Sequence, residues 1–160
     1  MQPRTPDYHK EVNRLFSSTP FISDLGLELA DYAPGRCRSR LTLAARHRQQ
    51  DGFVHAGVIA TMADHTAGAA AASLIGEGEI ILTAEYKINF LRAAQGAALE
   101  CRAVVIKPGR TLSVVEAEVF SIADEKTTLV SKALLTMAVV STATLSSIEN
   151  EDSGPNDVTG

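Results

Sequence analysis

A long alanine-rich segment near the middle of the 160-residue chain constrains the fold more than any other feature. Residues 56–74 contain no proline and consist mainly of Ala, Val, Ile, Leu and Met. Alanine runs such as residues 69–72 favour helix. Because apolar residues occur on every side of the projected helix, the pattern predicts a helix that is buried. The segment is too short and too rich in glycine to be a membrane span.

A single acid, Asp64, lies in the middle of this predicted helix. A carboxylate among small apolar side chains costs free energy unless another group pairs with it or the protein uses it. Two interpretations are therefore open: a buried acid that caps a neighbouring strand, and an acid that takes part in chemistry. The nearby Gln49 and the start of the helix favour the second.

Composition limits the domain organisation and the function classes. We expect one domain over residues 1–145, followed by a disordered acidic tail over residues 146–160, where the composition shifts to Ser, Glu, Asn, Asp and Gly. The formal net charge is −4. The tail holds four acids and no Lys or Arg, so the rest of the chain is close to neutral. Nothing in this distribution indicates a nucleic-acid partner.

The two cysteines and the N-terminus indicate the compartment. Cys37 and Cys101 are far apart, fit no metal or redox spacing, and fall in predicted strands, so we interpret them as small buried thiols. The N-terminal residues contain no apolar core of the kind that a signal peptide needs. The default expectation is a cytoplasmic protein with reduced thiols and no membrane association.

Hydrophobic periodicity predicts one short helix and six strands around the central helix. The helix spans residues 6–18 and is followed by an apolar connector over residues 21–25. Two strands precede the central helix and four follow it, over residues 26–32, 36–43, 80–91, 97–107, 110–121 and 127–140. Short turns between consecutive strands indicate antiparallel pairing, so we expect the last four strands to form a meander.

These elements predict an α+β fold. A helix that is apolar on every side must be covered, and a curved antiparallel sheet is the only cover that this chain offers. A sheet on one side leaves its own edges and the far side of the helix unprotected. We therefore expect two copies to associate edge to edge.

The start of the central helix, near residues 55–57, is suited to acyl transfer. The first N–H groups of a helix, here those of Ala56 and Gly57, have no intrahelical partner and carry a partial positive charge. Such donors can stabilise a carbonyl oxygen as it becomes an oxyanion. Gln49, six residues before His55, can donate its amide to the same oxygen. Asp64 can attack the carbonyl directly or act as a base on water.

The spacing of these residues suggests a site between subunits. Asp64 follows His55 by nine residues, which at about 100° per residue is half a turn out of phase. On one helix the two residues would face opposite ways. This favours an arrangement in which Asp64 of one subunit meets the helix N-terminus of another.

Three segments of the chain resemble a known family. QQDGFVHAGVIATMADHTAG, TAEYKINFLRAA and KPGRTLSVVEAEVF are similar to the hotdog-fold acyl-CoA thioesterases of the phenylacetate-pathway type, and the likeness covers roughly residues 10–140. The family pattern is Gln or Asn, then His-Gly-Gly six residues on, then an acid nine residues beyond the His. It maps onto Gln49, His55-Ala56-Gly57 and Asp64. Ala56 and Ala93 depart from it, since the family usually has glycine and proline there.

The resemblance implies the roles of individual residues. Asp64 would be the base or nucleophile, the Ala56 N–H would polarise the thioester carbonyl, and a hydroxyl on Thr83 would orient water. Arg92 and Arg110, the latter followed by Thr111, would bind the phosphates of coenzyme A, for which arginine is well suited. The resemblance further implies an acyl-CoA substrate, no cofactor other than the coenzyme A of the substrate, and a homodimer or homotetramer.

Other interpretations stay open at this point. Three histidines could join Asp64 as metal ligands, but His55 and His65 lack the helical spacing of a zinc pair and no thiol joins them. A non-catalytic acyl-CoA or acyl-carrier binding protein would need no acid at position 64. A dehydratase or hydratase of related fold would need a histidine placed against the acyl chain. The acyl group, aryl or aliphatic, and its carrier are not determined by the sequence.

Overall fold

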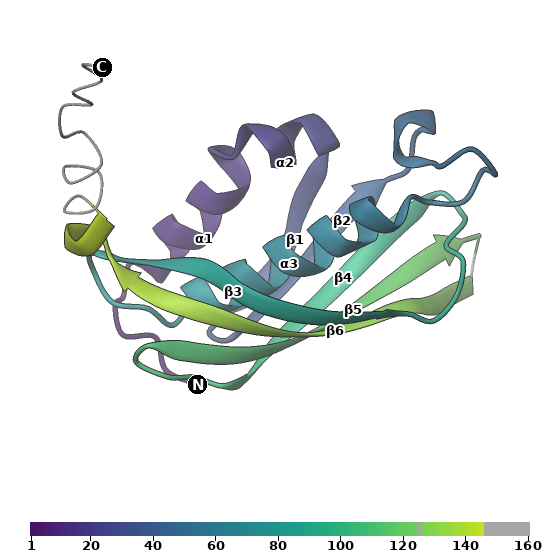
Figure 1. Ribbon diagram of the computed structural model, residues 1–160. Helices are drawn as coiled ribbons and strands as arrows, with labels where there is room; N and C mark the ends of the chain where they lie inside the picture. Colours follow the sequence, from purple (N-terminus) through teal and green to yellow (C-terminus); the bar gives the residue numbers. More distant parts are fainter. Residues whose placement is uncertain (125, 146–160) are drawn as a thin grey trace, which may run out of the picture.

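A six-stranded antiparallel sheet wraps around one long helix, α3 (Ala56–Ala72), as Figure 1 shows. The computed structural model describes residues 1–124 and 126–145, so the predicted tail over residues 146–160 lies outside the described residues. The strands are β1 (Leu27–Ala33), β2 (Arg36–Thr42), β3 (Glu79–Phe90), β4 (Ala98–Lys107), β5 (Leu112–Ala123) and β6 (Lys126–Ser141). The predicted α+β fold, with an antiparallel sheet around a central helix, is confirmed.

The position of β3 differs from the prediction. The strand order is β1-β2-β4-β5-β6-β3, so β3 pairs with β6 and forms an edge of the sheet. The prediction of a four-stranded meander is therefore wrong for β3 and right for β4, β5 and β6. The reason is that β2 already occupies the free side of β4, with Cys37 opposite Ala103. β3 pairs instead with the outer side of β6.

The N-terminal region contains two helices instead of one. The first, α1, spans Tyr8–Ser17, and the second, α2, spans Pro20–Leu25, where the sequence predicted a connector. Pro20 stands in the first turn of α2, where its fixed φ suits a helix and its missing N–H costs nothing. Gly26 ends the helix with a φ of 81°, a conformation that favours glycine. The Thr19-Pro20 pair starts a second helix as well as ending the first.

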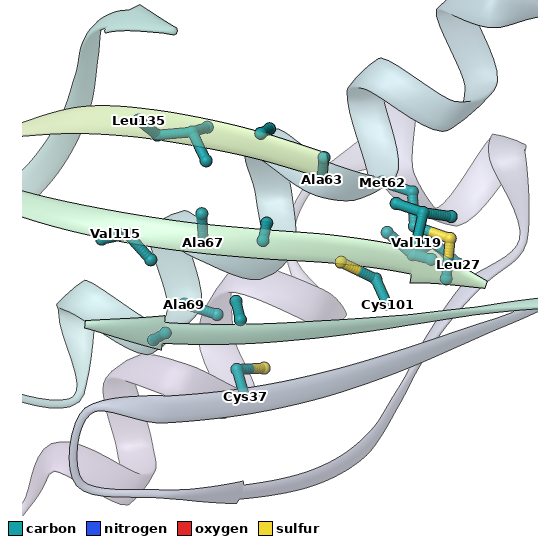
Figure 2. Close-up of a cluster of buried hydrophobic side chains, with 14 of the residues drawn as sticks. Leu27, Cys37, Met62, Ala63, Ala67, Ala69, Cys101, Val115, Val119 and Leu135 are labelled. Carbon is teal, nitrogen blue, oxygen red and sulfur yellow. The ribbon is translucent and has the colours of Figure 1, made fainter. Parts of the chain in front are cut away.

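Small residues let α3 lie close to the sheet. Figure 2 shows Met62, Ala63 and Ala67 of α3 gathered with strand side chains such as Val115 and Val119.

Both cysteines are free and buried in this core, as interpreted from the sequence. Within the described residues, no helix combines the length and the apolar character needed to cross a membrane.

One side of α3 is not covered by its own chain. The residues along it are exposed or only partly buried, and we call them the α3 stripe: Gly57, Ala60, Thr61, Asp64 and Gly68. This agrees with the expectation that a sheet on one side leaves the far side of the helix unprotected within one chain. The rest of the helix is covered, and nine of its residues are buried.

A buried pair of hydroxyls fixes α3 against the sheet close to Asp64. The Thr66 hydroxyl lies 2.6 Å from that of Ser39 on β2 and donates to the Met62 carbonyl at 2.6 Å. Both side chains have no exposed surface. Because both hydroxyls are buried, the helix cannot slide along β2 without leaving them unpaired, which costs free energy.

Candidate active site

The first turn of α3 leaves one backbone donor free. His55 precedes the helix in an extended conformation, and its ring Nδ1 accepts a hydrogen bond from the Gly57 N–H at 2.9 Å. In the part of the chain that the structure describes, the Ala56 N–H makes no hydrogen bond. The N–H of Gly57 is thus engaged by His55, and that of Ala56 is available to a ligand.

A cavity of about 550 Å³ opens in front of this turn. It is lined by Gln49, Gln50, Phe53, Val54, His55, Ala56, Ile59 and the segment 90–94. The side-chain oxygen of Gln49 accepts from the Asp51 N–H at 2.6 Å. This bond fixes the Gln49 side chain and leaves its amide nitrogen without a partner among the described residues. Two uncommitted N–H donors therefore line one cavity.

Asp64 lines a different cavity, further along the same helix. The hydroxyl of Thr83 on β3 donates to the Asp64 carboxylate at 2.7 Å. The cavity beside Asp64 measures about 350 Å³ and includes Gly57, Ala60, Thr61 and His65 of α3. Thr19, Phe21 and Ile22 at α2 and Tyr86 on β3 form its other walls. Asp64, held by the Thr83 hydroxyl, thus lies beside a pocket lined by both apolar and polar side chains.

His65 does not join Asp64 in a catalytic pair. Its ring packs edge-on against Phe16 of α1, with ring centres 4.7 Å apart. Burial lowers the pKa of His65 below its ordinary value, although the neighbouring Asp64 carboxylate acts in the opposite direction. The neutral ring is therefore favoured, and it is a packing element between α1 and α3. Among the described residues, no three His, Cys, Asp or Glu side chains cluster as metal ligands would.

The Ala56 N–H and the Asp64 carboxylate of a single chain are too far apart to contact the same carbonyl group. Ala56 and Asp64 are eight residues apart, which in a helix corresponds to about 12 Å along the axis. Reacting atoms must approach to about 3–3.5 Å. Each chain thus carries two separated half-sites: a donor half-site at Ala56 and Gln49, and an acid half-site at Asp64 and Thr83.

The arginines chosen from the sequence lie at opposite ends of α3. Arg92 lines the donor half-site and donates to the Leu129 carbonyl at 3.0 Å. Arg110 lines a separate cavity of about 350 Å³ with Leu74 and Ile75, beyond the C-terminus of the helix. The structure therefore brings Arg92 to Gln49, His55 and Ala56. It does not bring Arg110, or the exposed Thr111 beside it, to either half-site of the same chain.

Sequence reasoning missed two aromatic residues beside Asp64. Phe21 reaches this cavity because it stands on α2, which was not predicted, and Tyr86 reaches it because β3 is an edge strand. The signal for Phe21 was present in Thr19-Pro20, a typical start of a helix. For Tyr86 no local signal existed, since the place of a strand in a sheet depends on distant segments.

Comparison with known proteins shows which family the chain is similar to. The sequence model of the Thioesterase superfamily matches residues 51–128, which include both half-sites except Gln49. A thioesterase family protein from Silicibacter pomeroyi is 34% identical, and the match covers 84% of this chain and 98% of that chain with a TM-score of 0.82. The 1,4-dihydroxy-2-naphthoyl-CoA hydrolase of Listeria monocytogenes is 29% identical over 72% of this chain and 91% of its own length.

A more distant structure shares the fold alone. The E. coli PaaI protein, from the phenylacetic acid degradation operon, is 17% identical and superposes with a TM-score of 0.75 over 86% of this chain and 96% of its own. A distant likeness of this kind and a closer one at 34% identity point to the same architecture. The chain belongs to the thioesterase superfamily and has its hotdog fold.

Proposed function

We propose that the protein hydrolyses the thioester of an acyl-CoA at a site that two subunits share. The observation that carries this proposal is the pair of separated half-sites. The Ala56 N–H and the amide nitrogen of Gln49, neither of them bonded among the described residues, lie at one, and Asp64, held by Thr83, lies at the other. Neither is complete alone, and the α3 stripe, which includes Asp64, is not covered by its own chain.

The α3 stripe is complementary to itself in an antiparallel pairing. With a twofold axis between Ala60 and Thr61, each Ala60 opposes Thr61 of the partner subunit, and each Gly57 opposes the partner subunit's Asp64. The side chains at the centre of the stripe are small, so two helices can approach closely there. This pairing places the carboxylate of one subunit at the first helical turn of the other.

The edge strand β3 supports the same twofold axis. Leu82, Tyr86 and Phe90 on β3 are each about half exposed, at 47–49%. An edge strand with exposed apolar side chains and an unpaired backbone is a template for another strand. Antiparallel pairing of β3 with the partner's β3 covers these side chains and brings the two α3 stripes together.

The proposed chemistry uses both half-sites. The Ala56 N–H and the Gln49 amide of one subunit hold the carbonyl oxygen while negative charge develops on it. The partner's Asp64 either takes a proton from water, which attacks the carbonyl carbon, or attacks that carbon itself to form an anhydride that water then opens. The carbon–sulfur bond breaks, and the thiolate leaves and takes up a proton. The products are a carboxylic acid and free coenzyme A.

Both arginines can serve one substrate in such a dimer. Arg92 lies in the donor half-site of its own subunit. Arg110 and Thr111 lie beyond the C-terminus of α3, which in an antiparallel pair is next to the donor half-site of the partner. We therefore assign the phosphates of coenzyme A to Arg92 of one subunit and to Arg110 with Thr111 of the other. No other cofactor is required by this chemistry.

Release of free thiol tests the proposal directly. Purified protein is incubated with a panel of aryl-CoA and medium-chain aliphatic acyl-CoA thioesters, and coenzyme A is detected with a disulfide dye. We expect turnover of at least one member well above the rate without protein. A complete absence of thiol release over the panel would contradict hydrolase activity and favour a binding role.

The protein's own cysteine thiols should not react with the dye that detects coenzyme A. Burial raises the pKa of both Cys37 and Cys101 to about 12. Since the thiolate is the reactive species, neither should react with the dye in the native state. We expect no labelling until denaturant is added, and then two thiols per chain. Rapid labelling of the native protein would show that the core opens on the time scale of the assay.

Ala56→Pro should abolish most of the activity without unfolding the protein. Proline lacks the N–H that we assign to the oxyanion, but it is favoured at the first position of a helix. His55 has φ −62° and ψ 136°, a conformation that residues before proline prefer. We expect kcat to fall about 10²–10³-fold, the usual effect of losing one oxyanion donor.

The comparison variant for this prediction is Ala56→Gly, which keeps the N–H and removes only the methyl group. It should lose much less activity than Ala56→Pro. The unfolding temperature of each variant, measured by circular dichroism, separates loss of the donor from loss of the fold. Equal rates for the proline variant and the wild type would remove the Ala56 N–H from the mechanism.

A further inference from the structure

We propose that His47 is a positioning residue for the oxyanion donors. This inference rests on the proposed function and adds a residue that touches no substrate, since His47 lines neither half-site cavity. Its side chain is 1% exposed. A histidine in such a place costs free energy of desolvation unless its ring nitrogens are paired.

The ring and the backbone of His47 join three segments of the chain. Ring Nδ1 accepts from the Ala44 N–H at 3.0 Å, and ring Nε2 lies 2.9 Å from the Leu25 carbonyl oxygen at the end of α2. The His47 carbonyl accepts from the His55 N–H at 2.9 Å. One residue therefore ties the end of α2, the turn after β2 and the residue that precedes α3. We call these three bonds the His47 clamp.

Only one form of the ring satisfies the clamp. A backbone N–H always donates, so Nδ1 must be the acceptor for Ala44. The proton of the neutral ring is then on Nε2 and is donated to the Leu25 carbonyl. The Arg46 Nε lies 3.2 Å from Nε2 but cannot donate to a nitrogen that carries a proton. The Arg46 Nη2 instead donates to the same Leu25 carbonyl, at 3.4 Å. A ring protonated on both nitrogens would lose the bond to Ala44.

The clamp sets the base of the loop that carries the donors. Residues 48 and 54 pair as an isolated antiparallel bridge, and the Gln49 N–H donates to the Phe53 carbonyl at 2.8 Å. The hydrogen bond from the His55 N–H to the His47 carbonyl joins the residues on either side of this bridge and closes the same loop next to Ala56. The position of the Gln49 amide relative to the Ala56 N–H therefore depends on where His47 is held. A displacement of about 1 Å in such a geometry can cost about a hundredfold in rate.

Three substitutions separate the two ring contacts. In His47→Asn, the amide oxygen can stand where Nδ1 stood and keep the bond from Ala44. In His47→Gln, the amide nitrogen can stand where Nε2 stood and keep the bond to Leu25. His47→Leu has a similar size and removes both. We expect kcat to fall about a hundredfold for Leu and less for Asn and Gln, with KM within a few-fold of the wild-type value.

A matched control is available on α1. The His9 ring is also hydrogen-bonded, with Nδ1 3.2 Å from the Tyr32 hydroxyl oxygen, but His9 is exposed and lines neither half-site cavity. His9→Leu should leave kcat and KM unchanged. A His47→Leu protein that folds, dimerises and keeps the wild-type kcat would overturn the proposal. So would a drop in kcat that Asn and Gln share fully with Leu.

Hydrogen exchange tests the clamp without any substrate. In the wild type, the His55 and Gln49 amide hydrogens are bonded within the loop and should exchange slowly. In His47→Leu they should exchange at least about tenfold faster, while amides in β5 and β6 keep their rates. Unchanged exchange in the loop overturns the clamp whether or not the protein hydrolyses any thioester. If the Leu variant does not fold, Asn and Gln, each of which keeps one ring bond, decide by the same two measurements.

Discussion

Asp64→Asn should lower kcat for thiol release by about 10²–10⁴-fold, the range for loss of a general base, and by more if the acid is the nucleophile. Asparagine has the size of aspartate, and its oxygen can still accept the Thr83 hydroxyl that now lies 2.7 Å from the carboxylate. The variant should therefore keep the local packing. What it loses is the ability to take a proton or to attack a carbonyl carbon.

The matched control for this substitution is Asp24→Asn on α2. The Asp24 side chain is exposed, makes no hydrogen bond or ion pair among the described residues and lines neither half-site cavity, so its replacement removes the same charge outside both half-sites. We expect its rate to equal that of the wild type. Undiminished turnover by Asp64→Asn, measured at saturating acyl-CoA, would refute the catalytic role and leave a structural acid.

The elements of this fold could be predicted because their signals are local. The alanine run of α3 and the alternation in β2, where arginines stand between buried residues, follow from a few neighbouring side chains. The neighbour of β3 could not be predicted in the same way. Its pairing with β6 joins residues such as Thr83 and Met137, which lie far apart in sequence, and it depends on β2 having taken the side of β4.

The candidate site shows the same division. Helical register predicted Asp64 and the start of α3 on opposite faces, but Gly57 in the first turn and Asp64 line one cavity. What separates the acid from the Ala56 N–H is distance along the helix axis. Which N–H stays free was not predictable, because it depends on the His55 ring turning to Gly57. The His47 clamp could not be predicted from the sequence either, because Leu25 stands 22 residues earlier and only the folded chain brings its carbonyl to the His47 ring.

Two inactive variants should restore activity to each other if the site is shared. When Asp64→Asn and Ala56→Pro subunits exchange at random, half of the dimers are mixed. In a mixed dimer one site carries both lesions and the other carries none, because the intact Ala56 N–H and the intact Asp64 come from different chains. About one quarter of the wild-type activity should therefore appear after exchange. The mixture before exchange, with thiol release followed in the same assay, gives the baseline.

The reciprocal mixture makes the test independent of how complete the recovery is. A chain that carries both substitutions is exchanged with wild-type chains, and every site of a mixed dimer then has one lesion if the site is shared. Activity should fall to about one quarter, whereas sites built within one chain would leave about one half. No recovery in the first mixture together with one half in the second would place both groups in one chain. That result would refute the shared site, which we infer from the separation of about 12 Å between Ala56 and Asp64 along α3.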